Sequence, residues 1–283
     1  MTHTPLETLA ARFEAERPRL RALARRMLGS AAEAEDAVQE FSLRLASASE
    51  VDNLAAWLTT VVSRICLDLL RARRETPFEQ LPDRGVAGPE EDLALADEVG
   101  RALLVVLAAL APAERVAFVL HDLFSVPFEA VSPILDRSPA TAKKLASRAR
   151  LRVRGTPAAG SGLGEHRKVV EAFLAAARGG DLAALLELLA PDVVRHADAA
   201  ALPPGAAAVL RGADAVARGT TAFADHARLA EPALMDGTVG LVLAPYGRLT
   251  GVLKVSVTAG RVAAYEVIAD PERLAKVAVA VLP

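Results

Sequence analysis

The sequence is poor in the residues on which disulfide frameworks and many metal sites depend. It holds a single cysteine among 283 residues, so no internal disulfide can form, and one thiol cannot build a zinc site. Cys66 lies among Val61, Val62, Ile65 and Leu67. An apolar setting of this kind is typical of a buried, unreactive thiol.

Long apolar runs are also missing. The stretch from Ala102 to Pro112 is among the longest, and it is far shorter than the roughly 20 residues that a membrane helix needs. Met1 to Leu9 carries no basic patch followed by an apolar run, so we expect no secretory signal. The sequence therefore predicts a cytoplasmic protein with no membrane partner.

The familiar signatures of cofactor and metal chemistry are absent as well. The sequence shows no metal-ligand spacing, no phosphate-cradling glycine loop and no nucleophile elbow. We accordingly expect no cofactor, no metal ion and no catalytic residue.

What is present is the composition of an ordinary globular protein. Hydrophobic residues make up 52% and charged residues 24% of the chain, which excludes wholesale disorder. At roughly 100 to 200 residues per domain, the length suits two or three domains.

Charge is unevenly distributed along the chain, although the net charge is only -2. Residues 75–100 are strongly acidic, whereas residues 137–154 contain no acid at all. The cationic residues of the second stretch are Arg137, Lys143, Lys144, Arg148, Arg150, Arg152 and Arg154. Such a density of like charge usually marks a docking place for something anionic.

Two stretches rich in proline, glycine or alanine divide the chain. Residues 76–89 are typical of an extended connector and residues 155–164 of a flexible hinge. The resulting segments are 1–75, 90–154 and 165–283.

The first segment is predicted to be helical throughout. Ser30 followed by Glu33 forms a capping box, and Asp52 or Asn53 can cap the next helix. The apolar face of that second helix includes Leu54, Trp57, Leu58, Val61, Val62 and Ile65.

The second segment has the spacing of a helix-turn-helix. Phe128 to Leu135 is the first helix of the pair, and Asp136-Arg137 forms a tight corner. Ser138 caps the second helix, in which Pro139 takes the first position. This helix would place Thr141, Lys143, Lys144, Ser147 and Arg148 within reach of a major groove. Pro133 should remove one hydrogen bond from the first helix and kink it.

The third segment is predicted to be an α+β cone with an internal pocket. Val169 to Leu174 is helical, and Asp181 caps a helix from Leu182 to Leu189. Alternating patterns predict strands of a curved antiparallel sheet at Thr238–Leu243, Leu249–Thr258 and Arg261–Ile268. Turns are expected at Asp236-Gly237, Pro245–Arg248 and Ala259-Gly260.

The first 154 residues resemble a bacterial sigma factor of the extracytoplasmic-function (ECF) group. Segments 31–45, 53–75 and 107–154 carry the resemblance. Together with the third segment, which is similar to a SnoaL-like or NTF2-like cone, they match the subgroup in which a fused SnoaL-like domain replaces a separate anti-sigma protein. The resemblance implies two all-α sigma domains, a region 2 bundle (1–75) and a region 4 helix-turn-helix (90–154), followed by an α+β cone.

The resemblance also implies the partners and contact residues of region 2. An acidic-polar helix face would meet the β′ clamp helices of core RNA polymerase; its residues are Glu33, Glu35, Asp36, Gln39 and Glu40. The helix from Asn53 to Arg74 would hold a base of the -10 element out of the stack, with Asn53, Arg64 and Arg71 as candidates. Trp57 is the only tryptophan, and its helical spacing favours core packing over a stacking platform.

Region 4 would meet the β flap of the polymerase and the -35 element of promoter DNA. Lysine and arginine contacts to phosphate would supply most of the affinity, while Thr141, Lys144 or Arg148 would read bases. The -35 candidates are Ser138, Thr141, Lys143, Lys144, Ser147 and Arg148. An intramolecular contact between the cone and the sigma regions would regulate the protein in cis.

Two short motifs distinguish the cone. Where the subgroup has Asp-Gly-Gly-Gly-Lys, this sequence has Asp198 followed by three alanines and Leu202. Asp270 to Leu274 preserves the chemistry of the subgroup's Asn-Pro-Asp-Lys-Leu signature.

Two other hypotheses stay open at this point. The chain could be a stand-alone helix-turn-helix regulator whose cone binds a ligand. It could also carry a cyclase or isomerase in the cone, with His196, Asp198, Asp225 and His226 as acid/base candidates.

Overall fold

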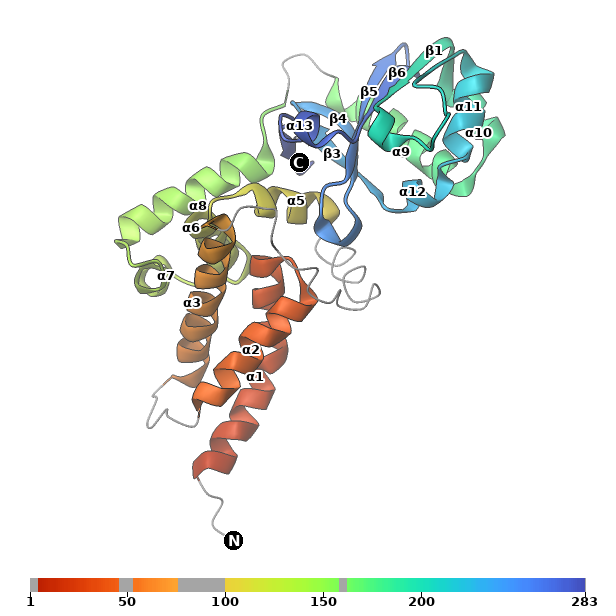
Figure 1. The fold of residues 1–283 in the computed structure, drawn as a ribbon. Coiled ribbons are helices and arrows are strands. Elements are labelled where there is room, and N and C mark those ends of the chain that lie inside the picture. Colours follow the sequence, from red (N-terminus) through yellow and green to blue (C-terminus); the bar gives the residue numbers. More distant parts are fainter. Residues whose placement is uncertain (1–4, 46–52, 76–99, 158–161, 283) are drawn as a thin grey trace. The chain divides into compact units, whose positions relative to one another are not determined.

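The computed structural model describes residues 5–45, 53–75, 100–157 and 162–282 (Figure 1). Contacts divide the chain into two units, Met1–Val99 with Leu107–Arg150, and Gly100–Val106 with Leu151–Pro283. The predicted connector 76–89 lies outside the described residues. No helix of the described part is long and apolar enough to cross a membrane.

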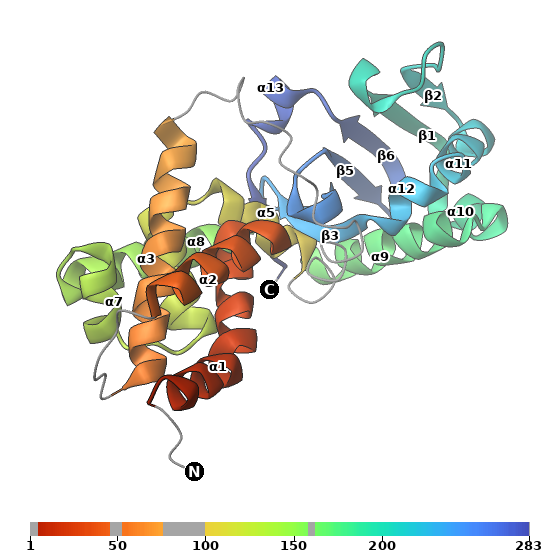
Figure 2. The same ribbon diagram turned by 60° about the horizontal axis from the view of Figure 1, so that its bottom comes forward.

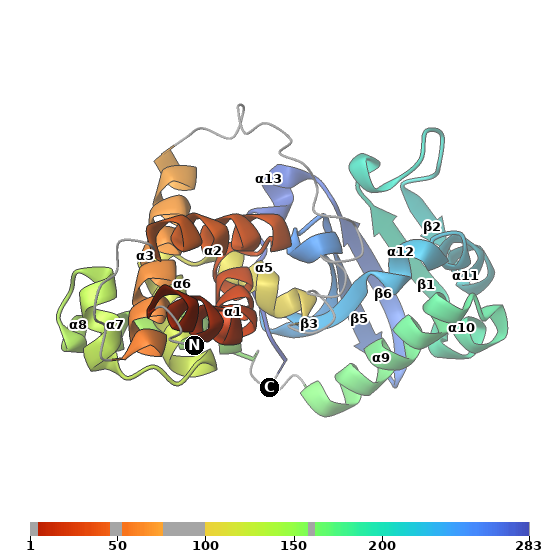
Figure 3. The same cartoon turned by 90° about the horizontal axis from the view of Figure 1, so that it is seen from below.

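The first unit is entirely helical. Its elements are α1 (Pro5–Leu28), α2 (Ala31–Leu45), α3 (Leu54–Glu75), the end of α5 (Arg101–Ala109), α6 (Pro112–Phe118), the π-helical turn η2 (Val119–Leu123), α7 (Phe128–Leu135) and most of α8 (Pro139–Arg154). Helices α1, α2 and α3 pack side by side, as Figures 1 and 3 both show. Helix α3 also packs against α6 and α7. The segments that resemble region 2 and region 4 therefore share one core.

Local signals place the helix starts where the sequence predicts them. The Glu33 N–H donates to Ser30 Oγ at 3.4 Å, and α2 begins at Ala31. The Ala56 N–H donates to Asn53 Oδ1 at 3.1 Å, and α3 begins at Leu54. These caps satisfy amides that a helix leaves without an internal partner, so the prediction of both starts is confirmed.

The second unit contains one twisted sheet (Figure 2) with helical residues packed against both of its faces. Its helices are α9 (Leu163–Gly179), α10 (Leu182–Leu188), α11 (Ala213–Thr221), α12 (Ala224–Arg228) and α13 (Pro271–Leu274), with short 3-10 turns η3 (Ala199–Ala201) and η4 (Pro245–Gly247). Its strands are β1 (Leu189–Ala197), β2 (Val209–Arg211), β3 (Ala230–Met235), β4 (Thr238–Leu243), β5 (Gly251–Thr258), β6 (Arg261–Ile268) and β7 (Val279–Ala280). The strand order is β2-β1-β6-β5-β4-β3-β7.

The three strands predicted from the sequence pair antiparallel as expected, but the sheet also contains one parallel pair. Strands β1 and β6 pair in parallel, while the other neighbouring strands pair antiparallel. Between them the chain runs through two α-helices and four further strands. Since that is a crossover connection and not a hairpin, the two strands can point the same way.

Tight turns define the hairpins of this sheet as predicted. Asp236 and Gly237 have φ of 50° and 86°, and Ala259 and Gly260 have φ of 49° and 74°. Two consecutive left-handed residues form the turn whose twist matches that of the flanking strands. Asp181 caps α10 by accepting the Ala184 N–H at 3.0 Å.

The beginning of α5 belongs to the second unit. Its residues Gly100–Val106 pack with the sheet, where Ala102 and Val105 are buried in a cluster that also holds Ala233, Val242, Val252 and Ile268. The Arg101 N–H donates to Glu231 Oε2 at 2.6 Å. A carboxylate at the start of a helix is favoured by the helix dipole, so Glu231 of β3 fixes this end of α5.

The two cone motifs meet in space. Asp198 Oδ2 accepts the N–H groups of Ala269 and Asp270, both at 3.1 Å, and Asp198 also pairs with Arg273. Arg273 bridges to Glu266 at 2.6 Å. The aspartate of the first motif thus holds the second motif. This contact uses only the carboxylate of Asp198, so it does not need the glycines that follow the aspartate in the subgroup's motif.

These contacts decide the protonation of Asp198. Burial raises its pKa, but hydrogen bonds from the backbone of Asp270 and Ala269 and from Arg273 outweigh that effect, so the pKa lies below its ordinary value. Since the ionised form is favoured in the folded protein, it contributes stability above the ordinary pKa of about 3.9. That contribution is lost as the pH falls through the lowered pKa.

We predict that Asp198→Asn lowers the free energy of unfolding of the cone by about 2 kcal/mol at pH 7, because charge-assisted hydrogen bonds are weakened. The measurement is thermal unfolding by circular dichroism between pH 7 and pH 2.5. The difference from the wild type should be constant at neutral pH and should close below about pH 4. A difference that does not narrow on acidification would contradict the assignment.

Candidate nucleic-acid interface

Helices α7 and α8 form the helix-turn-helix that the sequence predicts. Three residues join them, and Asp136 adopts a left-handed conformation with φ of 54° and ψ of 51°. The N–H groups of Asp136 and Arg137 both donate to the Ser132 carbonyl, which closes the end of α7. This is a helix end formed by a left-handed residue, followed by Ser138 and Pro139 at the start of the next helix.

Pro133 lies inside α7, and the hydrogen bond that it removes is partly replaced. The carbonyl of Glu129 would accept from residue 133 in an uninterrupted helix, but proline has no N–H. Ser132 Oγ donates to that carbonyl at 3.2 Å. The proline is therefore compatible with the helix that precedes the corner.

Helix α8 has a small buried side and a large cationic side. Ala142, Ala146 and Ala149 are buried, at the spacing of one helix face. Lys143, Lys144, Ser147 and Arg148 are exposed, while Thr141 is partly exposed. The structure thus places these five predicted residues, from Thr141 to Arg148, on the accessible part of α8.

The cationic side of α8 is mostly uncompensated. Arg150 pairs with Asp122 of η2 at 2.5 Å. Lys143, Lys144 and Arg148 make no ion pair with any residue that the structure describes. Three exposed cations within two turns of one helix form the electrostatic footprint of a polyanion site.

Ser138 and Thr141 form hydrogen bonds with each other. Ser138 Oγ accepts the Thr141 N–H at 3.3 Å and lies 2.9 Å from Thr141 Oγ1. Ser138 is therefore the cap of α8, as predicted. The same contact holds the Thr141 side chain beside the first turn of the helix.

The candidates of region 2 share one face of α3. Asn53, Arg64 and Arg71 are separated by eleven and seven residues, about three and two helical turns, and together span about 27 Å of helix. All three are exposed, and each has a partner. Asn53 caps α3, Arg64 donates to the Pro133 carbonyl of α7 at 2.9 Å, and Arg71 pairs with Asp68 at 3.3 Å.

The acidic face of α2 is divided by the structure. Asp36, Gln39 and Glu40 are exposed at helical spacing. Glu35 pairs with Arg17 at 2.7 Å and with Arg21 at 2.6 Å, both on α1. Glu33 pairs with Arg73 of α3. The five predicted residues therefore do not form one free face.

The structure adds a buried arginine that the sequence does not single out. Arg115 of α6 is 5% exposed, and burial together with nearby Arg73 lowers its pKa to about 10 while Glu33 opposes the decrease. Glu33 thus lies near two guanidinium groups from distant segments. The only local signal is the charged pair Glu114-Arg115 within an otherwise apolar run.

Two smaller predictions also meet the structure. Cys66 is buried, as predicted, and burial raises the pKa of its thiol to about 12, which disfavours the reactive thiolate. Trp57 is half-buried on α3, so neither a core role nor a stacking role is decided.

The acid/base candidates of the cone are not brought together. His196 and Arg195 are consecutive in β1 and point to opposite faces of the sheet, with His196 exposed and Arg195 buried. Asp198 is engaged by the backbone of the second motif. Asp225 and His226 are exposed on α12.

Sequence comparison defines the class of protein to which this arrangement belongs. Residues 12–76 match the family described as sigma-70 region 2, and residues 100–153 match sigma-70 region 4. The α3 face falls in the first match and the helix-turn-helix in the second. The chain therefore combines both regions of a sigma-70-type transcription protein.

Individual relatives make the assignment narrower. The chain is 36% identical over 284 residues, covering 95% of both sequences, to the probable ECF RNA polymerase sigma factor SigI of Mycobacterium tuberculosis. It is 46% identical over 198 residues to the ECF RNA polymerase sigma factor SigJ of the same organism, spanning 66% of this chain and 64% of that relative. The chain belongs to the ECF RNA polymerase sigma factors.

A solved structure is also similar. The crystal structure of Mycobacterium tuberculosis SigJ has 34% sequence identity and a TM-score of 0.46, with 94% of this chain and 98% of that chain covered.

We predict that Ser138→Ala destabilises the first unit by about 1 kcal/mol, because α8 loses its cap. The measurement is chemical denaturation followed by the fluorescence of Trp57. Ser147→Ala, on the exposed side of the same helix, is the matched control and should change stability by less than about 0.5 kcal/mol. Equal effects of the two substitutions would show that Ser138 is not a cap in solution.

Proposed function

We propose that this chain is an alternative sigma factor, which binds core RNA polymerase and directs it to promoters through -10 and -35 elements. The observation that carries the proposal is the set of exposed cations Lys143, Lys144 and Arg148 on α8, which make no ion pair within the described part of a chain that matches both sigma-70 regions. We assign region 2 to residues 1–75, region 4 to 90–154 and the regulatory cone to 165–283.

The -35 element is the target of α8. Lys143 tracks phosphate, and affinity from such contacts falls steeply as salt rises. Thr141, Lys144 or Arg148 reads base edges, since sequence is read in the major groove and not at the phosphates. Ser138 and Ser147 complete this surface, Ser138 mainly by fixing the start of the helix.

The -10 element is the target of α3. Asn53, Arg64 and Arg71 lie on one face, where cations can follow the backbone of a separated strand. In the free protein Arg64 is bonded to the Pro133 carbonyl. Arg64 must give up this bond to reach DNA, so polymerase binding would separate α3 from α7 before the promoter is melted.

Core polymerase would bind at two places. The exposed residues Asp36, Gln39 and Glu40 support an electrostatic contact between α2 and the β′ clamp helices, with Glu33 and Glu35 joining once their internal pairs exchange. Region 4 would contact the β flap. Both contacts would hold the two DNA-binding modules at the spacing of the promoter elements.

The cone would regulate these steps in cis. The packing of Ala102 and Val105 with the sheet, and the bond from Arg101 to Glu231, support a link between the cone and the start of the region 4 match. A helix held at one end by the cone is less free to follow region 4 when the polymerase separates the modules.

A stand-alone regulator with a helix-turn-helix is the alternative. Such a protein would bind duplex DNA tightly without polymerase, whereas a sigma factor requires the polymerase for specific binding. Pull-down of core polymerase followed by run-off transcription separates the two.

We predict that Lys144→Ala and Arg148→Ala each weaken promoter binding of the reconstituted holoenzyme by about 1–3 kcal/mol if the residue reads a base, and relax the preference at one -35 position. Lys143→Ala should weaken binding to all promoter sequences alike, and it should reduce the slope of log affinity against log salt concentration by about one. The measurement is gel-shift titration at several salt concentrations.

The control for these substitutions is Arg218→Ala, an exposed cone residue paired with Asp214. It should leave promoter binding unchanged. If the α8 variants bind every promoter as the wild type does, α8 does not contact the -35 element.

We predict that Glu231→Ala raises run-off transcription by up to about fivefold, because the loss of one hydrogen bond at the start of α5 is worth about 1 kcal/mol. Glu187→Ala, an exposed residue of α10, is the control. Trimming the chain after Gly164 should also alter the rate. Transcription rates equal to that of the wild type in both the Glu231→Ala protein and the trimmed protein would count against regulation in cis.

A further inference from the structure

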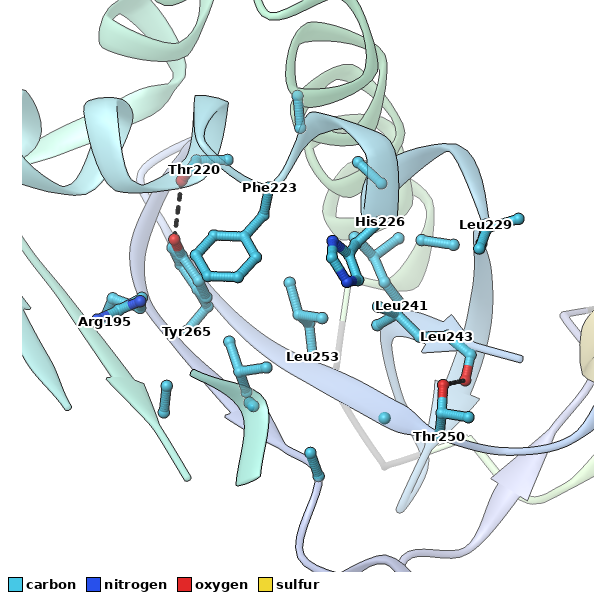
Figure 4. Close-up of a pocket in the computed structure, with 18 of the residues that line it drawn as sticks. Arg195, Thr220, Phe223, His226, Leu229, Leu241, Leu243, Thr250, Leu253 and Tyr265 are labelled. Atoms are coloured by element: carbon cyan, nitrogen blue, oxygen red, sulfur yellow. Dashed lines mark hydrogen bonds between the residues drawn. The ribbon is translucent and has the colours of Figure 1, made fainter. Parts of the chain in front are cut away.

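The second unit contains a cavity of about 460 Å³ that promoter recognition does not use. Side chains from α9, α11, α12 and strands β1, β4, β5 and β6 line it (Figure 4). This volume lies within the range of pockets that bind small organic molecules, about 300 to 1,000 Å³.

Most of the cavity wall is apolar. Aromatic and aliphatic side chains dominate it, among them Phe173, Phe223, Leu241, Leu253 and Val267. His226 and Thr250 lie on one side in Figure 4, and Thr250 Oγ1 already donates to the Leu243 carbonyl at 3.1 Å. An occupant therefore needs a largely apolar body.

One end of the cavity is cationic. Arg195 is 4% exposed, and it is the only lining residue with a permanent charge. It lies directly opposite Tyr265 in the pairing of β1 with β6, so the two side chains share one face of the sheet. Figure 4 shows Arg195, Tyr265 and Thr220 together on one side of the cavity.

The charge of Arg195 is not balanced inside the described part of the chain. One terminal nitrogen donates to the Ala207 carbonyl, and Nε has no hydrogen-bond partner. Glu266 follows Tyr265 in β6, points to the other face and pairs with Arg273. A buried cation without an anionic partner is costly.

Tyr265 does not provide the missing anion. Thr220 Oγ1 donates its single hydrogen to the Val216 carbonyl at 2.8 Å, so the contact of 2.8 Å between Thr220 and Tyr265 uses the phenol hydrogen. Burial raises the pKa of Tyr265, against the effects of Thr220 and Arg195. The phenol is therefore neutral at pH 7. Its hydrogen is used in the bond to Thr220, so its oxygen can only accept further hydrogen bonds.

We propose that this cavity binds a small apolar carboxylate, with the carboxylate beside Arg195 and the apolar body between α9, α12 and the sheet. The ligand supplies the negative charge that the protein does not provide. Binding without turnover is the expected outcome, since His196 lies on the other face of the sheet and Asp198 is held by the backbone of residues 269 and 270, so that His226 lines the cavity without a second acid/base candidate in its wall. This inference goes beyond promoter recognition and does not rest on it.

The test is isothermal titration of the full-length protein, without polymerase or DNA, with 2-naphthoate and with its neutral methyl ester. We expect 2-naphthoate to bind at least tenfold more tightly than the ester. Arg195→Met should lower the affinity for 2-naphthoate by at least tenfold and change the affinity for the ester by no more than about twofold. Arg218→Met removes an exposed cation of the same unit and should change neither affinity.

The comparison of acid and ester in the wild type does not depend on how well Arg195→Met folds. Hydrogen exchange of the complex locates the ligand, with protection expected in residues 219–229 and 241–253. Equal affinity for acid and ester, no binding of either ligand at millimolar concentration, or protection confined to α8 would each overturn the proposal. None of these results would bear on the sigma activity, which is measured with polymerase.

Discussion

Repulsion among the cationic side chains of α8 is the constraint on which the arrangement of region 4 depends. Seven bases and no acid lie between residues 137 and 154, so this helix can bury only its alanine stripe. Stability must then come from its ends and its neighbours. Ser138 and Pro139 fix the start of the helix, and the left-handed Asp136 fixes the corner before it. Asp122 of η2 forms an ion pair with Arg150 of α8. Lys143, Lys144 and Arg148 stay available for a polyanion because none of these contacts uses them.

The first unit places arginines where two sigma regions share a core. Glu33 lies near Arg73 of α3 and Arg115 of α6, which are far apart in the sequence. Arg64 joins α3 to α7 through a backbone carbonyl. These polar contacts cost less to exchange than an apolar core does, because charged groups released into water recover their hydration. Such contacts suit two modules that come apart, as the proposed binding to polymerase requires.

In the cone, Asp198 and the segment from Asp270 to Leu274 are in contact although three alanines follow Asp198. Asp198 holds the chain at residues 269 and 270, and Arg273 returns to Asp198 and Glu266. The alanines after Asp198 do not interfere, since the aspartate makes the contact through its own carboxylate. On the other side of β6 the cavity retains a buried arginine and a neutral tyrosine, so structural and binding roles lie on opposite faces of the same strand.

The sequence by itself determined the features that short-range physics controls. The caps at Ser30, Asn53, Ser138 and Asp181, the corner at Asp136 and the hairpin turns at Asp236 and Ala259 each depend on a few consecutive residues, and all were predicted. The exposed face of α8 followed from the helical period and from charge. Only the tertiary structure decided the partners of Arg64 and Glu33, the parallel pairing of β1 with β6, the attachment of α5 to Glu231 and the meeting of Arg195 with Tyr265. Each of these joins residues far apart in the chain, and no local pattern records which distant surface a side chain will meet when the core closes.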